Sequence, residues 1–359
     1  MTSVLQIDNF KCFRKQQIEF ADLTALVGAN GAGKSSVIQS LLLLRQSIEN
    51  PVADELQLNG PYGLYLGTDG SIGNNSMATG VTKLSMKSGD QLYKLQLKAQ
   101  SVEENLSIHV ANRSELSHRK DFFAKEFYYL SADRTGPRVS QAMRSLPYAH
   151  AGIYGEYAAQ ILAQPFIKID KLRMYPKSMD NSIGRQTNLW LSSILPGVEV
   201  KATANASMQV AQVLIKNGVT SDFLTSPNIG YGISYALPII LTGLIARRGS
   251  YMLVENPEAH LHPAAQSAMG RFLAMLSQNG VHVVVETHSD HVLDGIRIYA
   301  TQHKISLKSV VIHNFEIQNG AVRVESIKYT NKYTYDKWPK EFKDQSSSDY
   351  LEYYQAIQE

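Results

Sequence analysis

The chain has very little cysteine. Cys12 is the single cysteine among 359 residues, so no disulfide can form within the chain, and a disulfide-stapled scaffold is excluded. This composition is typical of a reducing compartment, and we expect a cytoplasmic protein. The first residues, Met1 to Val4, have no basic segment followed by a long apolar run, so we expect no secretory signal.

Long apolar runs and a strong net charge are also missing. The longest apolar stretch, around residues 235–246, is too short and interrupted to cross a bilayer, so we expect no membrane contact. The formal net charge is only +3, which gives no strong overall attraction to nucleic acid. Basic clusters at 113–120, 168–177 and 328–343 are interpreted as solvated faces, and DNA stays open as a partner. We find no internal repeat and no sustained heptads, which excludes a long coiled coil.

The most informative stretch is residues 28–35, which match the pattern G-x-x-x-x-G-K-[ST]. An apolar strand, 23–27, precedes it and a buried helix, 36–45, follows, which is the context that a phosphate-binding loop requires. Backbone N–H groups and the helix N-terminus favour phosphate, the lysine reaches the β- and γ-phosphates, and the serine hydroxyl binds Mg²⁺. We therefore predict ATP and Mg²⁺ as cofactors, bound by Asn30, Gly31, Ala32, Gly33, Lys34, Ser35 and Ser36.

The remainder of the chain predicts an α/β fold with a mixed sheet flanked by helices. Apolar strands at 251–254 and 281–285 alternate with helices at 234–246, 264–276 and 291–301, and a hairpin follows at 310–329. The middle segment has more antiparallel character, with a hairpin at 82–99 and short helices at 158–162 and 188–195. We expect one domain over 1–359, with an antiparallel and helical lobe inserted at 60–218 and a tail at 333–359.

The ends of two predicted strands supply polar side chains that can act beside a phosphate loop: an acid that positions Mg²⁺ and a histidine. Glu255 ends the strand Tyr-Met-Leu-Val-Glu, where an acid can position Mg²⁺ beside Ser35. His288 follows the strand Val283 to Glu286, and adjacent parallel strands bring both ends to one edge of the sheet. The segment from Asn228 to Ser234 is a glycine turn before a helix. The N-terminus of that helix is another place that favours an anion.

Together these segments resemble the heads of ABC-type AAA ATPases, and more closely the OLD-like and RecF-like branch. That branch includes ATPases of prokaryotic anti-phage systems such as Septu. The resemblance rests on GANGAGKSS, IGYGIS, YMLVENPEAHLHP, VVVETHSD and the opening NFKCF, and covers about 1–50 and 225–315. It implies a P-loop ABC-type head in which ATP joins two copies, as a homodimer or higher homo-oligomer.

The resemblance also implies individual roles. Residues 28–36 correspond to Walker A, Glu255 to the Walker B acid and His288 to the switch histidine, and His260-Leu261-His262 lies in the D-loop position. Gly232 and Ser234 stand in the signature region, which completes the nucleotide site of another subunit, although the segment does not match LSGGQ.

One departure predicts slow hydrolysis. Asn256 stands where these heads carry a catalytic glutamate, and an amide is a poor proton acceptor. Glu258 is the nearest carboxylate, and we expect it to take this role. The predicted catalytic set is therefore Lys34, Glu255, Glu258 and His288, in a switch held closed by ATP; a rapid basal turnover would refute this.

Three functions remain open from the sequence. The first is an ATPase switch that controls a partner, in anti-phage defence or DNA metabolism; the others are the nucleotide-binding subunit of a transporter and a nucleotide-sensing scaffold with negligible turnover. A nuclease domain does not fit after His288, so we expect a separate nuclease or toxin as the effector, in trans. His260 and His262 are interpreted as interface residues and not as a metal site, because no further cluster with zinc-like spacing accompanies them.

Overall fold

The computed structural model describes residues 3–74, 77, 80–99, 105–116, 121–219, 222–228, 230–337 and 353–355. Some sequence predictions fall partly outside these residues: the ends of two basic clusters (117–120 and 338–343), parts of the insertion at 60–218, Ile229 of the signature segment, and most of the tail at 333–359. Within the described residues, no helix is long and apolar enough to cross a membrane.

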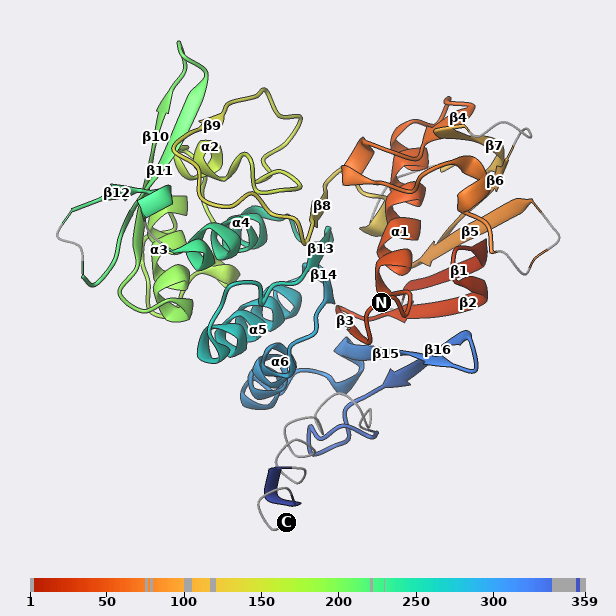
Figure 1. Ribbon diagram of the computed structural model, residues 1–359. Helices are drawn as coiled ribbons and strands as arrows, with labels where there is room; N and C mark the ends of the chain where they lie inside the picture. Colours follow the sequence, from red (N-terminus) through yellow and green to blue (C-terminus); the bar gives the residue numbers. More distant parts are fainter. Residues whose placement is uncertain are drawn as a thin grey trace.

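A central six-stranded sheet carries the phosphate loop and the predicted acidic and histidine residues at the ends of its strands. Its order is β16-β15-β3-β14-β13-β8 (Figure 1). Five neighbouring strands run parallel and the edge strand β16 is antiparallel to β15. The strands are β3 (Leu23–Gly28), β8 (Phe127–Leu130), β13 (Tyr251–Glu255), β14 (His282–Glu286), β15 (Val310–Gln318) and β16 (Ala321–Ile327).

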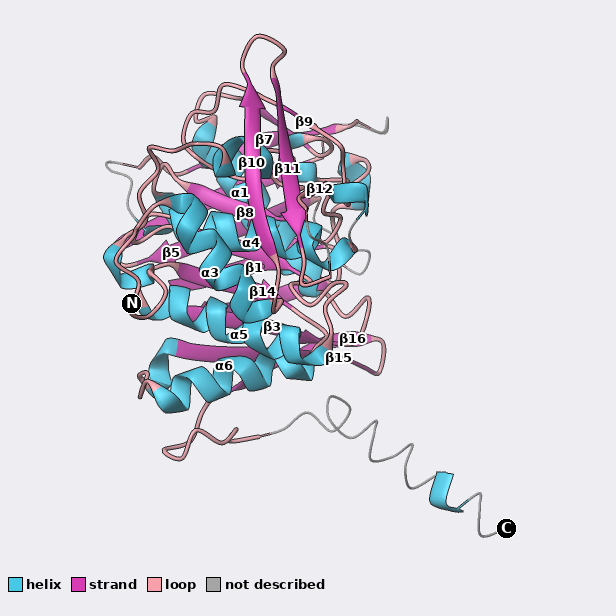
Figure 2. Ribbon diagram, turned by 90° about the vertical axis from the view of Figure 1, so that its left-hand side faces the viewer, coloured by secondary structure: helices cyan, strands magenta, loops and turns pink. Residues whose placement is uncertain are grey.

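The inner strands are apolar throughout because both faces of this sheet are covered. Side chains alternate along a strand, so Met252 and Val254 enter one core while Tyr251 and Leu253 enter the other. On one face lie α3 (Ile183–Ile194), α4 (Tyr231–Ile245), α5 (Pro263–Gln278) and α6 (Asp290–Gln302), seen in front of the strands in Figure 2. The opposite face packs against α1 (Lys34–Glu49).

Two antiparallel sheets flank the central one. The first has the order β2-β1-β5-β6-β7-β4 and packs on α1; its strands are β1 (Ser3–Phe10), β2 (Phe13–Phe20), β4 (Glu55–Gln57), β5 (Val81–Ser88), β6 (Gln91–Lys98) and β7 (Ser107–Arg113). The other joins β9 (Gln141–Ala142), β10 (Glu199–Asn205), β11 (Val210–Lys216) and β12 (Leu224–Thr225) beside α2 (Ala158–Leu162). The segment predicted as an insertion, 60–218, thus contributes strands to all three sheets.

The predicted fold class, an α/β head with a mixed sheet flanked by helices, is confirmed. The structure corrects several boundaries. The helix predicted at 188–195 begins earlier, at Ile183, and ends at Ile194, and short 3₁₀ turns lie at Pro61–Gly63 and Asp69–Ser71. Helix α4 begins at Tyr231, so Gly232 and Ser234 lie in its first turn and not in a turn that precedes it. The short strands β4, β9 and β12 have too few residues to show an alternating pattern in the sequence.

Candidate functional site

The loop between β3 and α1 has the geometry of a phosphate-binding loop. Gly28 has φ of +124°, and a Cβ there would lie 2.1 Å from the backbone oxygen of Phe315, so glycine is required at this position. Gly33, with φ of +103°, caps α1, which begins at Lys34. The loop therefore delivers residues 30–36 to the N-terminus of a helix that is 16 residues long.

Lys34 lies folded over this loop. Its Nζ donates to the backbone oxygens of Gly28 (3.0 Å) and Ala29 (2.8 Å), and the side chain is buried. Burial lowers the pKa of the Lys34 ammonium, an effect that the nearby Glu286 carboxylate opposes. The ammonium thus lies within the curve of the loop, where it can meet an anion.

Two glutamates end adjacent parallel strands at the same edge of the sheet. Glu255 of β13 pairs in register with Glu286 of β14, which confirms the predicted adjacency of these strand ends. β14 also pairs with β3, so it lies between the phosphate loop and Glu255. Burial, reinforced by Glu255, raises the pKa of Glu286 to about 7, while Lys34 and the bond from Ser35 oppose this shift.

Ser35 contacts Glu286. Its hydroxyl donates to the carboxylate oxygens of Glu286 at 3.1 and 3.3 Å. Glu255 instead accepts from the hydroxyl of Tyr129 (3.1 Å) and the backbone N–H of Ala132 (3.2 Å). Burial raises the pKa of Glu255, while these two hydrogen bonds lower it. Sequence reasoning missed Glu286, although a carboxylate at the end of a buried strand was a signal for it.

Glu258 joins the turn after β13 to the turn after β14. Its carboxylate accepts from the Thr287 hydroxyl (2.7 Å) and from the backbone N–H of His288 (2.8 Å). The His288 side chain is exposed, and burial of part of the ring together with Lys34 lowers its pKa, while Glu258 raises it. Asn256 adopts φ of +44°, and its backbone N–H donates to the carbonyl of Glu286. The four predicted catalytic side chains and Asn256 therefore come from the ends of three neighbouring strands.

The predicted signature residues, Gly232 and Ser234, lie on α4, away from the phosphate loop in the folded molecule. Gly232 approaches the D-loop position closely, since a Cβ there would lie 2.8 Å from the backbone oxygen of His260. The Ser234 hydroxyl is 3.2 Å from that of Ser226. In Figure 1, α4 lies on the opposite side of β13 and β14 from α1. Within the described residues, the structure therefore does not join Gly232 or Ser234 to the phosphate loop of the same chain.

Arg134, for which the sequence analysis predicted no role, holds the turn after β13 in place. Its guanidinium is buried and donates to the carbonyls of Ser131 (2.8 Å), Glu255 (2.6 Å) and Asn256 (2.6 Å). Burial lowers the pKa of this guanidinium to about 10, well above neutral pH, so it stays charged. The sequence around Arg134 is a stretch of small and polar residues without periodicity, and no pattern in it predicts a buried arginine.

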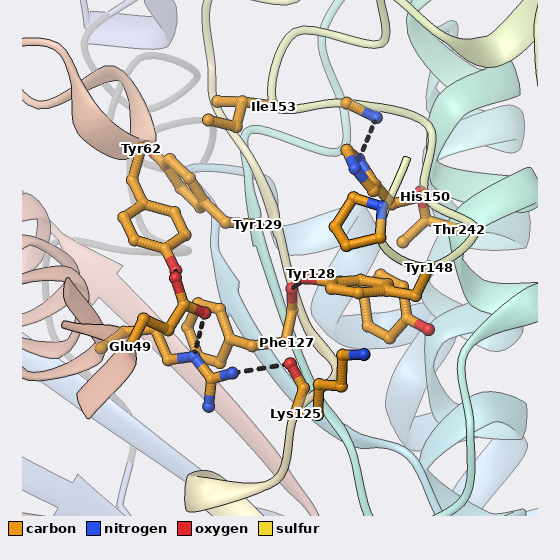
Figure 3. Close-up of a pocket in the computed structure, with 13 residues that line it drawn as sticks. Glu49, Tyr62, Lys125, Phe127, Tyr128, Tyr129, Tyr148, His150, Ile153 and Thr242 are labelled. Atoms are coloured by element: carbon orange, nitrogen blue, oxygen red, sulfur yellow. Dashed lines mark hydrogen bonds and ion pairs between the residues drawn. The ribbon is translucent and has the colours of Figure 1, made fainter. Parts of the chain in front are cut away.

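A cavity of about 440 Å³ lies beside β8 (Figure 3). Aromatic rings line it, among them Tyr62, Phe127, Tyr128 and Tyr148, and Arg45 and Glu49 of α1 form an ion pair in its wall. None of the residues of the phosphate loop is in its lining. We therefore place the candidate site at the sheet edge and not in this cavity.

The donor groups at the sheet edge fit a magnesium-bound nucleotide. Mg²⁺ is commonly held by one or two carboxylates and the oxygens of a nucleotide phosphate, with a P-loop hydroxyl. Ser35, Glu286 and Glu255 provide such oxygens. Among the residues that the structure describes, no group of three or more His, Cys, Asp or Glu side chains could hold a metal alone, His260 and His262 included.

The fold and this loop define the class of the protein as a P-loop head of the ABC type. A protein-family model described as "AAA domain, putative AbiEii toxin, Type IV TA system" matches residues 23–294. Because the match spans well over half of the chain, the chain belongs to this AAA-domain family.

Solved structures give the same fold. An Smc head domain from Pyrococcus furiosus, with an extended coiled coil and bound to the C-terminal domain of ScpA, is similar over 100% of both chains, with a TM-score of 0.54 and 12% identity. An SmcHead bound to the C-winged helix domain of ScpA is similar over 90% of this chain and 97% of that chain, with a TM-score of 0.53 and 13% identity. At these identities the similarity establishes the fold alone. Comparison with curated proteins finds no match.

Proposed function

We propose that this chain is an ATP-binding, slowly hydrolysing ABC-type ATPase switch that dimerises around ATP and controls a separate effector. The observation that carries the proposal is the hydrogen bond from Ser35 to a strand-end carboxylate, beside a loop that encloses the Lys34 ammonium. A chance glycine turn does not account for a lysine within its curve and a serine against an acid 251 residues away.

The residues act on the nucleotide in distinct ways. Residues 30–36 hold the phosphates by backbone N–H groups and the helix N-terminus, and Lys34 neutralises the β- and γ-phosphates. Ser35 and the two strand-end acids, Glu255 and Glu286, would form the magnesium site; Mg²⁺, when bound, neutralises charge that develops on the γ-phosphate. Glu258 and His288 orient water in this proposal, which the hydrogen bonds between Glu258 and the turn of Thr287 and His288 support.

Slow turnover follows from Asn256 and from the contacts of Glu258. The amide at position 256 is a poor base, and both carboxylate oxygens of Glu258 accept hydrogen bonds from the turn after β14. These contacts support a switch that stays closed while ATP is bound. They also favour the second candidate, a nucleotide-sensing scaffold, which differs only in having negligible turnover.

The branch and the partners are proposed on sequence motifs. The segment from Tyr251 to Pro263 and the Thr-His-Ser turn support the OLD-like or RecF-like branch and a role in anti-phage defence. The family description names a toxin of a toxin–antitoxin system, and the two Smc heads are described as bound to ScpA domains. Both descriptions support a protein partner in trans; a cytoplasmic location follows from the cysteine content.

Nucleotide binding by a Lys34→Ala variant tests the proposed function. We expect affinity for a non-hydrolysable ATP analogue with Mg²⁺ to fall by about 2–4 kcal/mol, because one charged contact to the phosphates is lost. Isothermal titration calorimetry measures this change. Lys201→Ala, on exposed β10, is the matched control and should bind as the wild type does. Wild-type affinity in Lys34→Ala would show that the site is assigned wrongly.

A further inference from the structure

The ends of β13 and β14 offer two carboxylates for one cation. The two strands lie at different distances from β3, the strand that leads into the phosphate loop. β14 is hydrogen-bonded directly to β3, with Glu286 paired to Leu26. β13 is one strand further away. Because neighbouring strands lie about 4.8 Å apart, Glu255 begins about one strand spacing further from the loop than Glu286 does.

The hydrogen bonds point the two carboxylates in different directions. Glu255 is bonded by Tyr129 and by Ala132, which belong to β8 and the turn after it. β8 lies on the side of β13 that faces away from β14 and β3. The oxygens of Glu255 are thus held toward the far strand.

Glu286 is directed the other way, toward the loop. In the part of the chain that the structure describes, its carboxylate accepts hydrogen bonds from the Ser35 hydroxyl alone, at 3.1 and 3.3 Å. Glu286 is 6% exposed, so few water molecules can solvate the charge of its carboxylate. A hydroxyl and a buried carboxylate in contact at the end of a phosphate loop are the pair of oxygen ligands that Mg²⁺ takes in such loops.

We propose that Glu286 is the carboxylate that holds the magnesium ion of the nucleotide together with Ser35, in the position that sequence reasoning gave to Glu255. The inference rests on the proposed function, since it needs a nucleotide at the loop. Glu255 then has a supporting role: it fixes the edge of the sheet through Tyr129 and Ala132, and its negative charge would add to the attraction for the ion.

This arrangement makes nucleotide binding depend strongly on the cation. Without Mg²⁺, the Glu286 carboxylate faces the negatively charged phosphates across the loop and repels them. With Mg²⁺, the same carboxylate becomes a ligand and favours the complex. Replacing Glu286 by a neutral amide therefore weakens binding with Mg²⁺ and strengthens it without Mg²⁺, which no structural role of this residue would produce.

The test compares the affinity for ATPγS in Mg²⁺ with that in EDTA, for the wild type and three variants. We expect Glu286→Gln to reduce the ratio of the two affinities at least tenfold, and Glu255→Gln to reduce it less. Glu286→Asp, which keeps the charge but withdraws it by one methylene, should give an intermediate ratio. Glu325→Gln, whose carboxylate pairs with Lys337 at 3.0 Å, is the control and should keep the wild-type ratio.

Mn²⁺ provides a second readout that does not depend on activity. Electron paramagnetic resonance of Mn²⁺ with ATPγS should show fewer bound ions per chain in Glu286→Gln than in Glu255→Gln at equal concentrations. A wild-type ratio in Glu286→Gln or Glu286→Asp, or a larger loss in Glu255→Gln, would overturn the inference. Failure of the proposed function looks different, because the wild type would then bind no ATPγS in either condition.

Discussion

At the scale of single residues, Arg134 shows how one side chain can fix the shape of an active-site turn. The planar guanidinium presents several N–H donors in a fixed fork, which suits it to gathering carbonyl groups. Here the guanidinium donates hydrogen bonds to the carbonyls of Ser131, Glu255 and Asn256, and Arg134 is 1% exposed. It thereby stabilises Asn256 in the left-handed conformation, φ +44°, which a non-glycine residue seldom adopts.

Arg134→Met should lower the free energy of unfolding by about 2–4 kcal/mol, because three backbone carbonyls lose a charged donor that is itself buried. Urea denaturation followed by circular dichroism measures this change. Arg247→Met, an arginine whose side chain is 80% exposed and paired with Glu126, is the matched control, and its effect should stay below about 1 kcal/mol. Equal losses in the two variants would contradict the structural role of Arg134.

At the scale of elements, α5 and α6 pack closely through two glycines. A Cβ at Gly295 would lie 2.0 Å from the backbone oxygen of Ser267, and one at Gly270 would lie 2.1 Å from that of Val292. In each helix, the backbone of the other helix lies where a side chain would otherwise be. The two glycines therefore allow the helices to approach closely. α5 follows the turn that contains Glu258, and α6 follows the turn that contains His288, so this packing sets the distance between two candidate catalytic turns.

Gly295→Ala should destabilise the protein by about 1–3 kcal/mol, because the two helices must move apart to admit a methyl group. The same substitution at Gly184 in α3, where no atom lies within 4 Å of the added carbon, should instead be neutral or stabilising, by up to about 1 kcal/mol. Thermal unfolding of the two variants side by side measures the difference. Destabilisation by Gly184→Ala of the same size would show that backbone entropy, and not helix packing, governs the effect.

At the scale of the whole molecule, α1, which follows the phosphate loop, and α4, which carries the signature residues, pack on opposite faces of the central sheet (Figure 1). Ser234 pairs with Ser226 and lines a small pocket together with Arg138 and Pro238, and this pocket contains no residue of the phosphate loop. A site that needs both segments must therefore take one of them from a second copy. This supports the proposed dimer around ATP.

Adding ATPγS and Mg²⁺ should double the mass of the purified chain, whereas ADP and Mg²⁺ should not, because the γ-phosphate is the group that a second copy would contact. Size-exclusion chromatography with light scattering measures the mass. Lys34→Ala should remain a monomer in every condition. A wild type that binds the nucleotide and stays monomeric would disprove dimerisation and leave nucleotide binding intact.

The sequence by itself determined the phosphate loop, because its chemistry is local. Glycines at residues 28, 31 and 33, followed by Lys34 and Ser35, dictate the loop and the start of α1 without help from the remainder of the chain. The buried strands that end at Glu255 and Glu286 were equally predictable, since parallel strands with both faces covered are apolar throughout.

Only the tertiary structure decided which groups meet at this loop. The order of β3, β14 and β13 places Glu286, and not Glu255, against Ser35, and no spacing along the chain encodes that order. The burial of Arg134 depends on the same long-range placement, since two of its acceptors lie more than 120 residues away. Local patterns reflect backbone geometry over a few residues, whereas contacts between distant segments arise from how the whole chain packs.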